Sequence, residues 1–320
     1  MTDTQNEVFK TPVNKIRLFE HGAPGSQNFK LTRKYYTEDM PDGRVKHIVQ
    51  NITDPDIVPY IPDGIGNSTD RQRIPAVLII PGGAFRRLVY NFEGEDVAKW
   101  LNSMGIAAFV LECRLPSDEH DNAEDVPLID AMRAMRVIRG RAQEFGIDEA
   151  KIGVMGFSAG GFMAALLSTA YESDVYADYK YKDEYDKLSA RPDFAVCSYP
   201  VISIDDCIEA GKRYMSEEQV LERISDSKAK ILHKYNPDKL VRPDMPPVFI
   251  CETDDDRTTL SENSVGFYMA ARKAGVSAEL HIFRTGGHGY GCGDDFAQTG
   301  EWKVCLLYTS PSPRDKRQSR

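Results

Sequence analysis

The chain has 320 residues, of which 41% are hydrophobic and 28% are charged, so it can bury the core of one large domain. Its net charge of -9 and pI near 5.3 argue against binding to a nucleic-acid backbone as its main task. The six cysteines form no C-x-x-C pair, no apolar run is long enough to span a membrane, and the first residues do not resemble a signal peptide. We therefore expect free thiols and a cytoplasmic location.

Residues 1–74 are rich in Asp, Pro, Gly and Asn and contain few apolar runs. This composition predicts a loose N-terminal extension that packs on the core, with one or two short strands, for example around 47–52. From residue 75 onward, short continuous apolar runs alternate with helical patterns, so we expect a catalytic domain over 75–307.

The apolar runs are typical of strands that are buried on both faces, and the segments between them have helical periodicity. Strands that alternate with helices form a mostly parallel sheet with helices on both faces, which is an α/β fold. The expected strands are 76–81, 106–113, 152–156, 194–199, 247–251 and 278–283, and the expected helices are 95–104, 128–138, 160–169, 261–274 and 297–306.

Two segments break this alternation. Residues 202–242 are polar, charged and prone to form helices, so they form either a cap over the strand ends or a solvated excursion. Residues 308–320 are rich in Ser, Pro and Arg with no apolar face, and we expect them to be a disordered, non-native tail.

The strongest motif is G-F-S-A-G at 156–160, because it lies between a predicted strand and a predicted helix. In this context the serine occupies a sharp turn that exposes its hydroxyl, and its neighbours two positions away must lack side chains. Ser158 is therefore the expected nucleophile. The N–H group of Ala159 is expected to stabilise the oxyanion at the start of the helix.

The motif P-G-G-A-F at 81–85 directly follows the first buried strand. In a fold with such a serine turn, the loop after this strand supplies further oxyanion donors. The backbone N–H groups of Gly83 and Ala84 are the expected donors. Without the serine motif, two adjacent glycines would indicate only a turn.

The base should be a histidine, because the serine hydroxyl needs an acceptor whose pKa lies near the working pH. Only His281 and His288 follow both Ser158 and a plausible acid, in the chain order that this fold requires. His281 lies within a strand pattern and is expected to be structural. His288 lies in the glycine-rich loop G-G-H-G-Y-G and is the expected base.

The acid should follow the strand that ends at residue 251, where the sequence continues E-T-D-D-D-R. Asp254, Asp255 and Asp256 all qualify by position. These three carboxylates could instead bind a cation, but the sequence shows no second set of ligands, so we expect no metal. One of the three is expected to orient His288.

With these residues placed, the chain resembles the acetyl-xylan-esterase and feruloyl-esterase-like branch of the α/β-hydrolases, which is similar to dienelactone hydrolases. The resemblance covers most of the chain, from I-R-L-F-E-H-G-A-P-G-S at 16–26 onward. Its other motifs are V-A-K-W-L-N-S-M-G-I-A-A-F-V-L, C-R-L-P, G-I-D, G-F-S-A-G-G, Y-P-V-I-S, E-N-S-V-G-F-Y and G-G-H-G-Y-G.

The resemblance implies an α/β-hydrolase fold and places the acid at Asp256, a few residues before E-N-S. Glu252 and Thr253 replace the usual His-Gly there, and Thr259 replaces a Val, so Asp255 stays possible. It also implies that Phe85 lines the acyl pocket, and we expect Phe157 to contribute to the substrate pocket. Cys113 stands where the family's Y-R-L-P motif has Tyr, which affects packing alone.

The implied activity is hydrolysis of short acyl esters, led by acetyl groups on xylan-derived or other plant-type sugars, through an acyl-enzyme and without a cofactor. The expected partner is a small-molecule or oligosaccharide ester, with no nucleic acid and no membrane. The alternatives are a peptidase-like or lipase-like specificity, or a non-catalytic binding protein with this fold. Residues 1–74 are too few for a peptidase propeller, and the charged 202–242 segment is unlike a lipase lid.

Overall fold

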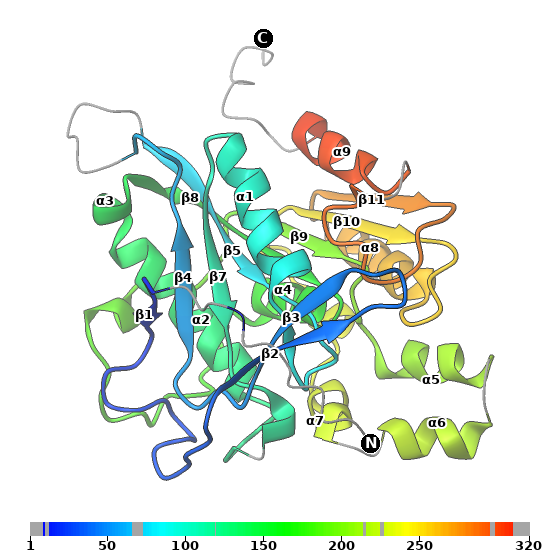
Figure 1. Cartoon of the computed structure of the whole chain (residues 1–320), viewed down its shortest axis with the longest axis horizontal. Coiled ribbons are helices and arrows are strands. Elements are labelled where there is room, and N and C mark those ends of the chain that lie inside the picture. The colour runs from blue at the N-terminus through cyan, green and yellow to red at the C-terminus, as the bar shows by residue number, and fades with distance from the viewer. Residues whose placement is uncertain are drawn as a thin grey trace.

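The computed structural model describes residues 9, 13–65, 73–118, 120–213, 216–224, 227–294 and 298–309. At its centre is an eight-stranded sheet with the order β1-β4-β7-β5-β8-β9-β10-β11 (Figure 1). The neighbours from β7 to β11 are parallel, whereas β1 and β4 join at one edge in antiparallel pairs. The strands are β1 (Ile16–Arg17), β4 (Asp56–Tyr60), β5 (Ile74–Ile80), β7 (Ala107–Glu112), β8 (Ile147–Phe157), β9 (Ala195–Ser198), β10 (Val248–Thr253) and β11 (Ala278–Phe283).

This sheet confirms the predicted α/β fold, and each predicted strand overlaps an observed one. The central strands form continuous apolar runs because helices cover both of their faces. Every residue of β7 is buried, for example, and β5 is buried from Ala76 to Ile80.

The helices form two layers on the sheet (Figure 1). Helices α1 and α9 meet on one face, where the rings of Trp100 and Trp302 lie 5.2 Å apart. Helices α2, α4 and α8 lie on the other face, where α4 packs on β8 and β9, and α8 on β10 and β11. Their bounds are η1 (Asn91–Glu95), α1 (Asp96–Ser103), η2 (Pro116–Asp118), α2 (Val126–Gly140), α3 (Ala142–Phe145), α4 (Ala159–Ala170), η3 (Glu184–Lys187), η4 (Pro237–Lys239), α8 (Ser261–Lys273) and α9 (Glu301–Thr309).

The N-terminal segment is more ordered than predicted. We expected one or two short strands before residue 75, and the structure has four that begin before Ile74. Two of them, β1 and β4, extend the main sheet. The hairpin β2 (Lys34–Asp39) and β3 (Val45–Gln50) forms a second, antiparallel sheet with β6 (Leu88–Val89). The sequence under-predicted these strands because their residues are half-buried rather than continuously apolar.

The hairpin β2–β3 supports the glycine-rich loop that precedes β6. The side chain of Gln50 donates a hydrogen bond to the carbonyl of Arg86. The carbonyl of His47 accepts from the N–H of Tyr90, and the N–H of His47 donates to the side-chain oxygen of Asn91. The N-terminal segment therefore fixes a loop that lies about 40 residues further along the chain.

The insertion at 202–242 is helical, as predicted. It contains α5 (Ile204–Lys212), α6 (Glu217–Ile224) and α7 (Ser227–Lys234). Helix α7 contacts η2, and Lys234 and Tyr235 both bind the carboxylate of Asp125. The insertion thus docks beside the carboxyl end of β7. Whether it closes over a substrate stays a prediction.

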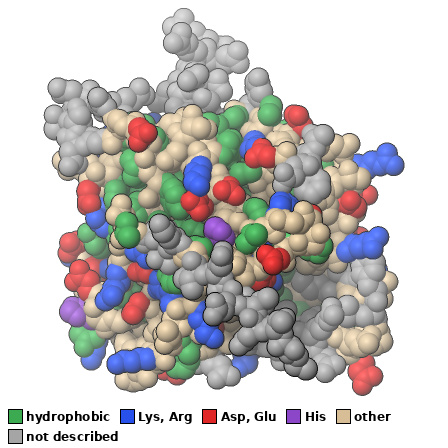
Figure 2. All heavy atoms as spheres, in the orientation of Figure 1, with side chains coloured by type: hydrophobic (Ala, Val, Ile, Leu, Met, Phe, Trp, Pro, Cys, Tyr) green, Lys and Arg blue, Asp and Glu red, His purple; other side chains and the backbone are tan. Residues whose placement is uncertain are grey.

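The last helix ends at Thr309, two residues inside the segment that we predicted to be a tail, and residues 310–320 lie outside the described residues. Within the described ranges, no helix has the length and hydropathy that a membrane span requires. Figure 2 shows acidic and basic side chains interspersed over the face that is seen in Figure 1.

Candidate active site

Ser158 lies on a strained turn between β8 and α4. Its backbone has φ 54° and ψ -119°, a conformation that costs a non-glycine residue of order 1–3 kcal/mol. Its N–H donates to the carbonyl of Ser198 at 3.0 Å, and its carbonyl accepts from the N–H of Phe162 at 3.0 Å. These two bonds hold the hydroxyl above the carboxyl edge of the sheet.

Close backbone contacts require glycine at both glycine positions of the G-x-S-x-G motif. A Cβ on Gly156 would lie 2.0 Å from the carbonyl oxygen of Gly160. A Cβ on Gly160 would lie 2.0 Å from the carbonyl oxygen of Ile80. Both contacts are with backbone, which cannot move aside cheaply, so the turn that exposes Ser158 excludes any other residue at these positions.

His288 reaches Ser158 from the loop after β11. Its Nε2 lies 2.8 Å from Ser158 Oγ, and its Nδ1 lies 2.7 Å from Asp256 Oδ2. The three residues come from three different strand ends and form one continuous hydrogen-bonded chain. This is the geometry in which an imidazole can take the serine proton while a carboxylate fixes its orientation.

The carboxylate of Asp256 is fully buried and held on both oxygens. Its Oδ1 accepts from the N–H groups of Thr258 at 2.7 Å and Thr259 at 2.9 Å, and its Oδ2 accepts from the Thr259 hydroxyl at 3.0 Å. Burial alone would raise the pKa of Asp256, but His288 and these donors hold it below the usual range. The carboxylate therefore stays ionised and can stabilise an imidazolium.

The other two aspartates of the D-D-D run do not reach the imidazole in this arrangement. Asp255 Oδ1 accepts from the N–H of Gly287 at 2.8 Å, which fixes the loop that carries His288. Asp254 is exposed, and its backbone N–H donates to Phe283. His281 pairs with Glu279 at 2.5 Å, in keeping with the structural role expected for it.

The loop at 81–85 faces Ser158. A Cβ on Gly82 would lie 2.9 Å from the Cβ of Ser158, and Ala84 and Phe85 both have positive φ. Within the described ranges, the N–H groups of Gly83, Ala84 and Ala159 have no protein acceptor, whereas Gly82 donates to Glu93. The three expected oxyanion donors are thus unoccupied by protein groups, and Gly82 is not.

Phe85 and Phe157, which we expected at the substrate pocket, lie in different surroundings. Phe85 packs edge-on against Phe162 and lines a small cavity next to Gly82 and Ala159. Phe157 is fully buried between Tyr199 and Trp302, so the structure contradicts its prediction as a pocket residue. The reason is the strand periodicity of β8, which turns the side chain before Ser158 into the core.

Three buried polar residues escaped the sequence analysis. Glu93 in η1 accepts from Gly82 and from the hydroxyl of Tyr199. Glu252 lies beside Asp256, where burial and that carboxylate raise its pKa well above the usual range. Glu93 lies in the polar segment N-F-E-G-E, which carries no signal of burial, and the apolar run at 247–251 ends just before Glu252, so sequence pattern did not indicate that either side chain is buried.

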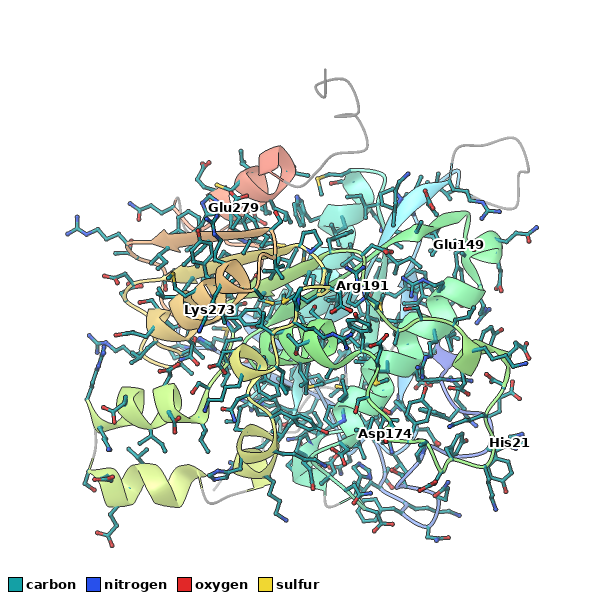
Figure 3. All side chains as sticks on the ribbon, turned by 180° about the vertical axis from the view of Figure 1, so that it is seen from behind. His21, Glu149, Asp174, Arg191, Lys273 and Glu279 are labelled. Atoms are coloured by element: carbon teal, nitrogen blue, oxygen red, sulfur yellow. The ribbon has the colours of Figure 1, made fainter. Side chains whose placement is uncertain are left out.

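A larger groove, of about 720 Å³, lies elsewhere. It is lined by Glu149 and Arg191, which Figure 3 shows on the face opposite to that of Figure 1. Glu149 belongs to the amino end of β8, while Ser158 follows its carboxyl end. In parallel sheets of this kind, ligands bind at the carboxyl ends of the strands, so this groove is not the candidate site. Among the described residues, no group of three or more His, Cys, Asp or Glu could hold a metal.

The sequence model of the BD-FAE family matches residues 65–270, which is more than half of the chain. The chain belongs to the BD-FAE family. Its fold is that of the α/β-hydrolases, as predicted.

The chain is also similar to a curated protein and to solved structures that are named as esterases or ester hydrolases. The acetylxylan esterase of Xylanibacter ruminicola is 30% identical over 249 residues, which are 75% of this chain and 46% of that protein. The crystal structure of the acetyl ester-xyloside bifunctional hydrolase from Caldicellulosiruptor lactoaceticus is 34% identical and covers 93% of this chain and 95% of its own, with a TM-score of 0.68. The butyrate-bound esterase Est2 of Thermogutta terrifontis is 25% identical over 80% of this chain and 88% of its own, with a TM-score of 0.60. The chain spans less than half the length of the curated relative from Xylanibacter.

Proposed function

We propose that this BD-FAE chain is a serine carboxylesterase that removes short acyl groups, acetyl above all, from xylan-derived or other plant-type sugars. The observation that carries the proposal is the hydrogen-bonded chain from Ser158 through His288 to Asp256, with distances of 2.8 and 2.7 Å. The named activities of the relatives from Xylanibacter and Caldicellulosiruptor support the same reaction class.

In the proposed reaction, Ser158 Oγ attacks the ester carbonyl while His288 Nε2 takes the serine proton. Asp256 holds Nδ1 of the imidazole and stabilises its charged form. The N–H groups of Gly83, Ala84 and Ala159 bind the oxyanion of the tetrahedral intermediate. His288 then protonates the leaving sugar oxygen. A water attacks the acyl-enzyme by the same route and releases the carboxylic acid.

The cavity beside the serine turn supports a small acyl group. It has a volume of about 10 Å³ and is lined by Ala159, which follows Ser158, and by Gly82, on which a Cβ would lie 2.9 Å from Ser158 Cβ. A cavity of this size holds about one water or one methyl group. Its lining includes Phe85, Leu115 and Met163, so the space is apolar and suits the methyl of an acetyl ester better than a longer chain.

The cysteines support the proposed cytoplasmic location. Among the described residues, the thiols of Cys113, Cys197, Cys251 and Cys292 are buried and form no disulfide. Buried free thiols persist in a reducing compartment. The net charge of -9 and the interspersed charges on the face in Figure 2 argue against a nucleic acid as the partner.

The test is a comparison of rates on p-nitrophenyl acetate, butyrate and octanoate and on acetylated xylo-oligosaccharides. We expect acetate to be preferred and Ser158→Ala to lower kcat by at least about 10³-fold. An organophosphonate probe should label the wild-type protein at Ser158 and leave the folded variant unlabelled. A preference for octanoate would favour a lipase-like enzyme. A folded wild-type protein with no labelling and no turnover would favour a binding protein.

A further inference from the structure

Glu93 is a buried carboxylate that the proposed reaction does not use. It lies in η1, shortly after the glycine-rich loop, and only 4% of its surface is exposed. Its Oε2 accepts from the N–H of Gly82 at 2.8 Å, and its Oε1 accepts from the hydroxyl of Tyr199 at 2.9 Å. Both oxygens are therefore engaged by donors that come from different parts of the chain.

Tyr199 connects Glu93 to the loop that carries His288. It directly follows β9, is fully buried and has φ 36°. Its hydroxyl accepts from the N–H of Gly291 at 3.0 Å, and its ring lies 5.0 Å from the ring of His288 at an angle of 68°. The Tyr199 hydroxyl thus joins Glu93 to the segment three residues beyond the base.

Close packing leaves these groups little freedom. A Cβ on Gly82 would lie 2.7 Å from Glu93 Oε2 and 2.9 Å from Ser158 Cβ. A Cβ on Gly291 would lie 2.6 Å from the carbonyl oxygen of Phe92, the neighbour of Glu93. The glycine-rich loop therefore packs against both Ser158 and η1, and the His288 loop packs against η1 as well.

The pKa of Glu93 is raised overall, and its role as an acceptor rests on the geometry of its two hydrogen bonds. Burial raises the pKa of Glu93, while His288, the hydroxyl of Tyr199, the N–H of Gly82 and the more distant Lys46 oppose that change. Burial and Glu93 raise the pKa of Tyr199 well above its usual range, so the phenol stays protonated and donates. Because the Tyr199 hydroxyl also accepts from the N–H of Gly291, its own proton is directed at Glu93 Oε1, which makes Tyr199 the donor and Glu93 the acceptor.

We propose that Glu93 and Tyr199 act as a positioning pair. Their hydrogen bonds fix the glycine-rich loop and the His288 loop in position relative to Ser158. The inference rests on the proposed function, because it assigns the pair a role in acyl transfer. Neither side chain needs to touch the substrate. Their loss would displace the oxyanion donors and the base relative to each other, and small displacements of this kind lower kcat more than they weaken substrate binding.

The first test is Tyr199→Phe, which removes the hydroxyl and keeps the ring beside His288. We expect kcat for p-nitrophenyl acetate to fall about 10- to 100-fold while KM changes by less than about threefold. The melting temperature should stay within roughly 4 °C of wild type. The matched control is Tyr290→Phe, whose ring lies 4.5 Å from that of Tyr199 and whose hydroxyl lies beside the Cys251 thiol; its kcat should stay near that of wild type.

The second test is Glu93→Gln, alone and combined with Tyr199→Phe. An amide offers only one acceptor oxygen, so one of the two donors loses its partner and kcat should fall with KM again little changed. Because the pair acts as a unit, the double variant should be no slower than the slower single variant. Additive losses, an unchanged kcat in Tyr199→Phe, or equal losses in the Tyr290→Phe control would overturn the inference. If wild type is active and Ser158→Ala is not, those outcomes leave the proposed function intact; an inactive wild type removes the proposed function itself.

Discussion

The turns at the carboxyl ends of the central strands and the helices of the 202–242 insertion are held in different ways. The turns depend on backbone strain and on buried hydrogen bonds. Ser158 and Ala84 have positive φ, and Asp256 accepts bonds on both oxygens in a fully buried position. Few alternative arrangements satisfy such groups, because a buried polar atom without a partner is costly.

The insertion instead carries exposed ion pairs. Lys212 pairs with Glu209 and Glu217, and Arg213 pairs with Glu262 on α8, with about half of each side chain of the second pair exposed. Exposed pairs of this kind contribute little to stability. The difference predicts that substitutions at the turns cost activity or several kcal/mol, whereas substitutions of these exposed pairs in the insertion cost little.

The largest effect should come from Asp256→Asn. The amide keeps the shape but cannot hold the imidazole in the same tautomer, so we expect kcat to fall by roughly 10³- to 10⁴-fold. The measurement is kcat on p-nitrophenyl acetate at neutral pH. The control is Asp255→Asn, which keeps an oxygen for the N–H of Gly287 and should cost less than about tenfold. Equal losses in the two variants would reopen the assignment of the acid.

The next effect concerns stability at the end of β7. Arg114 and Asp130 form a fully buried pair at 2.6 Å, and Arg114 also donates to Ser26 at 2.8 Å in the N-terminal segment. Arg114→Met leaves the Asp130 charge buried without its cation, with the backbone N–H of residue 114 as its remaining donor at 2.8 Å, so the free energy of unfolding should fall by about 3–5 kcal/mol. Urea unfolding of the variant measures this loss.

A double variant separates charge from packing at the same place. Arg114→Met combined with Asp130→Leu removes both charges and should recover a large part of the lost stability. A double variant as unstable as Arg114→Met alone would show that the bond to the N-terminal segment, and not the unpaired charge, accounts for the loss.

Glu252→Gln should change how stability depends on pH. Burial and Asp256 keep a proton on Glu252 in the folded chain at pH values where the unfolded chain has lost it. Wild-type stability should therefore fall by up to about 1.4 kcal/mol per unit as the pH rises above the unfolded pKa, and the Gln variant lacks this slope. The stability of the Gln variant relative to wild type should therefore increase as the pH rises above the pKa of a Glu in the unfolded chain, as measured by urea unfolding. Parallel pH curves would contradict a protonated Glu252.

Sequence pattern predicted the parallel sheet because its signal is local: each run such as 106–113 is apolar over its own length. The same holds for Ser158, whose glycines two positions away are dictated by backbone contacts within the turn. The order of nucleophile, acid and base along the chain then left His288 as the expected base and three adjacent aspartates as candidates for the acid. Geometry favours Asp256, which lies 2.7 Å from the imidazole.

What sequence pattern missed depends on contacts between distant segments. The pairing of β3 with β6 and the bond from Glu93 to Tyr199 join residues about 40 and 106 positions apart, and no local pattern records them. The prediction that Phe157 contributes to the substrate pocket was wrong for a related reason. Its motif position suggested a site, but the pleat of β8 turns its side chain toward Trp302 in the core.

The smallest effect should come from Arg213→Gln, in the insertion. Its pair with Glu262 is half-exposed, so the free energy of unfolding should change by less than about 1 kcal/mol, and the difference should shrink at about 1 M salt. Arg213 holds the pKa of Glu262 below its usual value, so any contribution is fully present above the pKa of the unfolded chain and is lost as the pH falls through the lower pKa of the folded chain. Turnover of p-nitrophenyl acetate should be unchanged. A tenfold loss of kcat with unchanged stability would instead mean that α5 and α6 are coupled to the site, and would favour a cap over a solvated excursion.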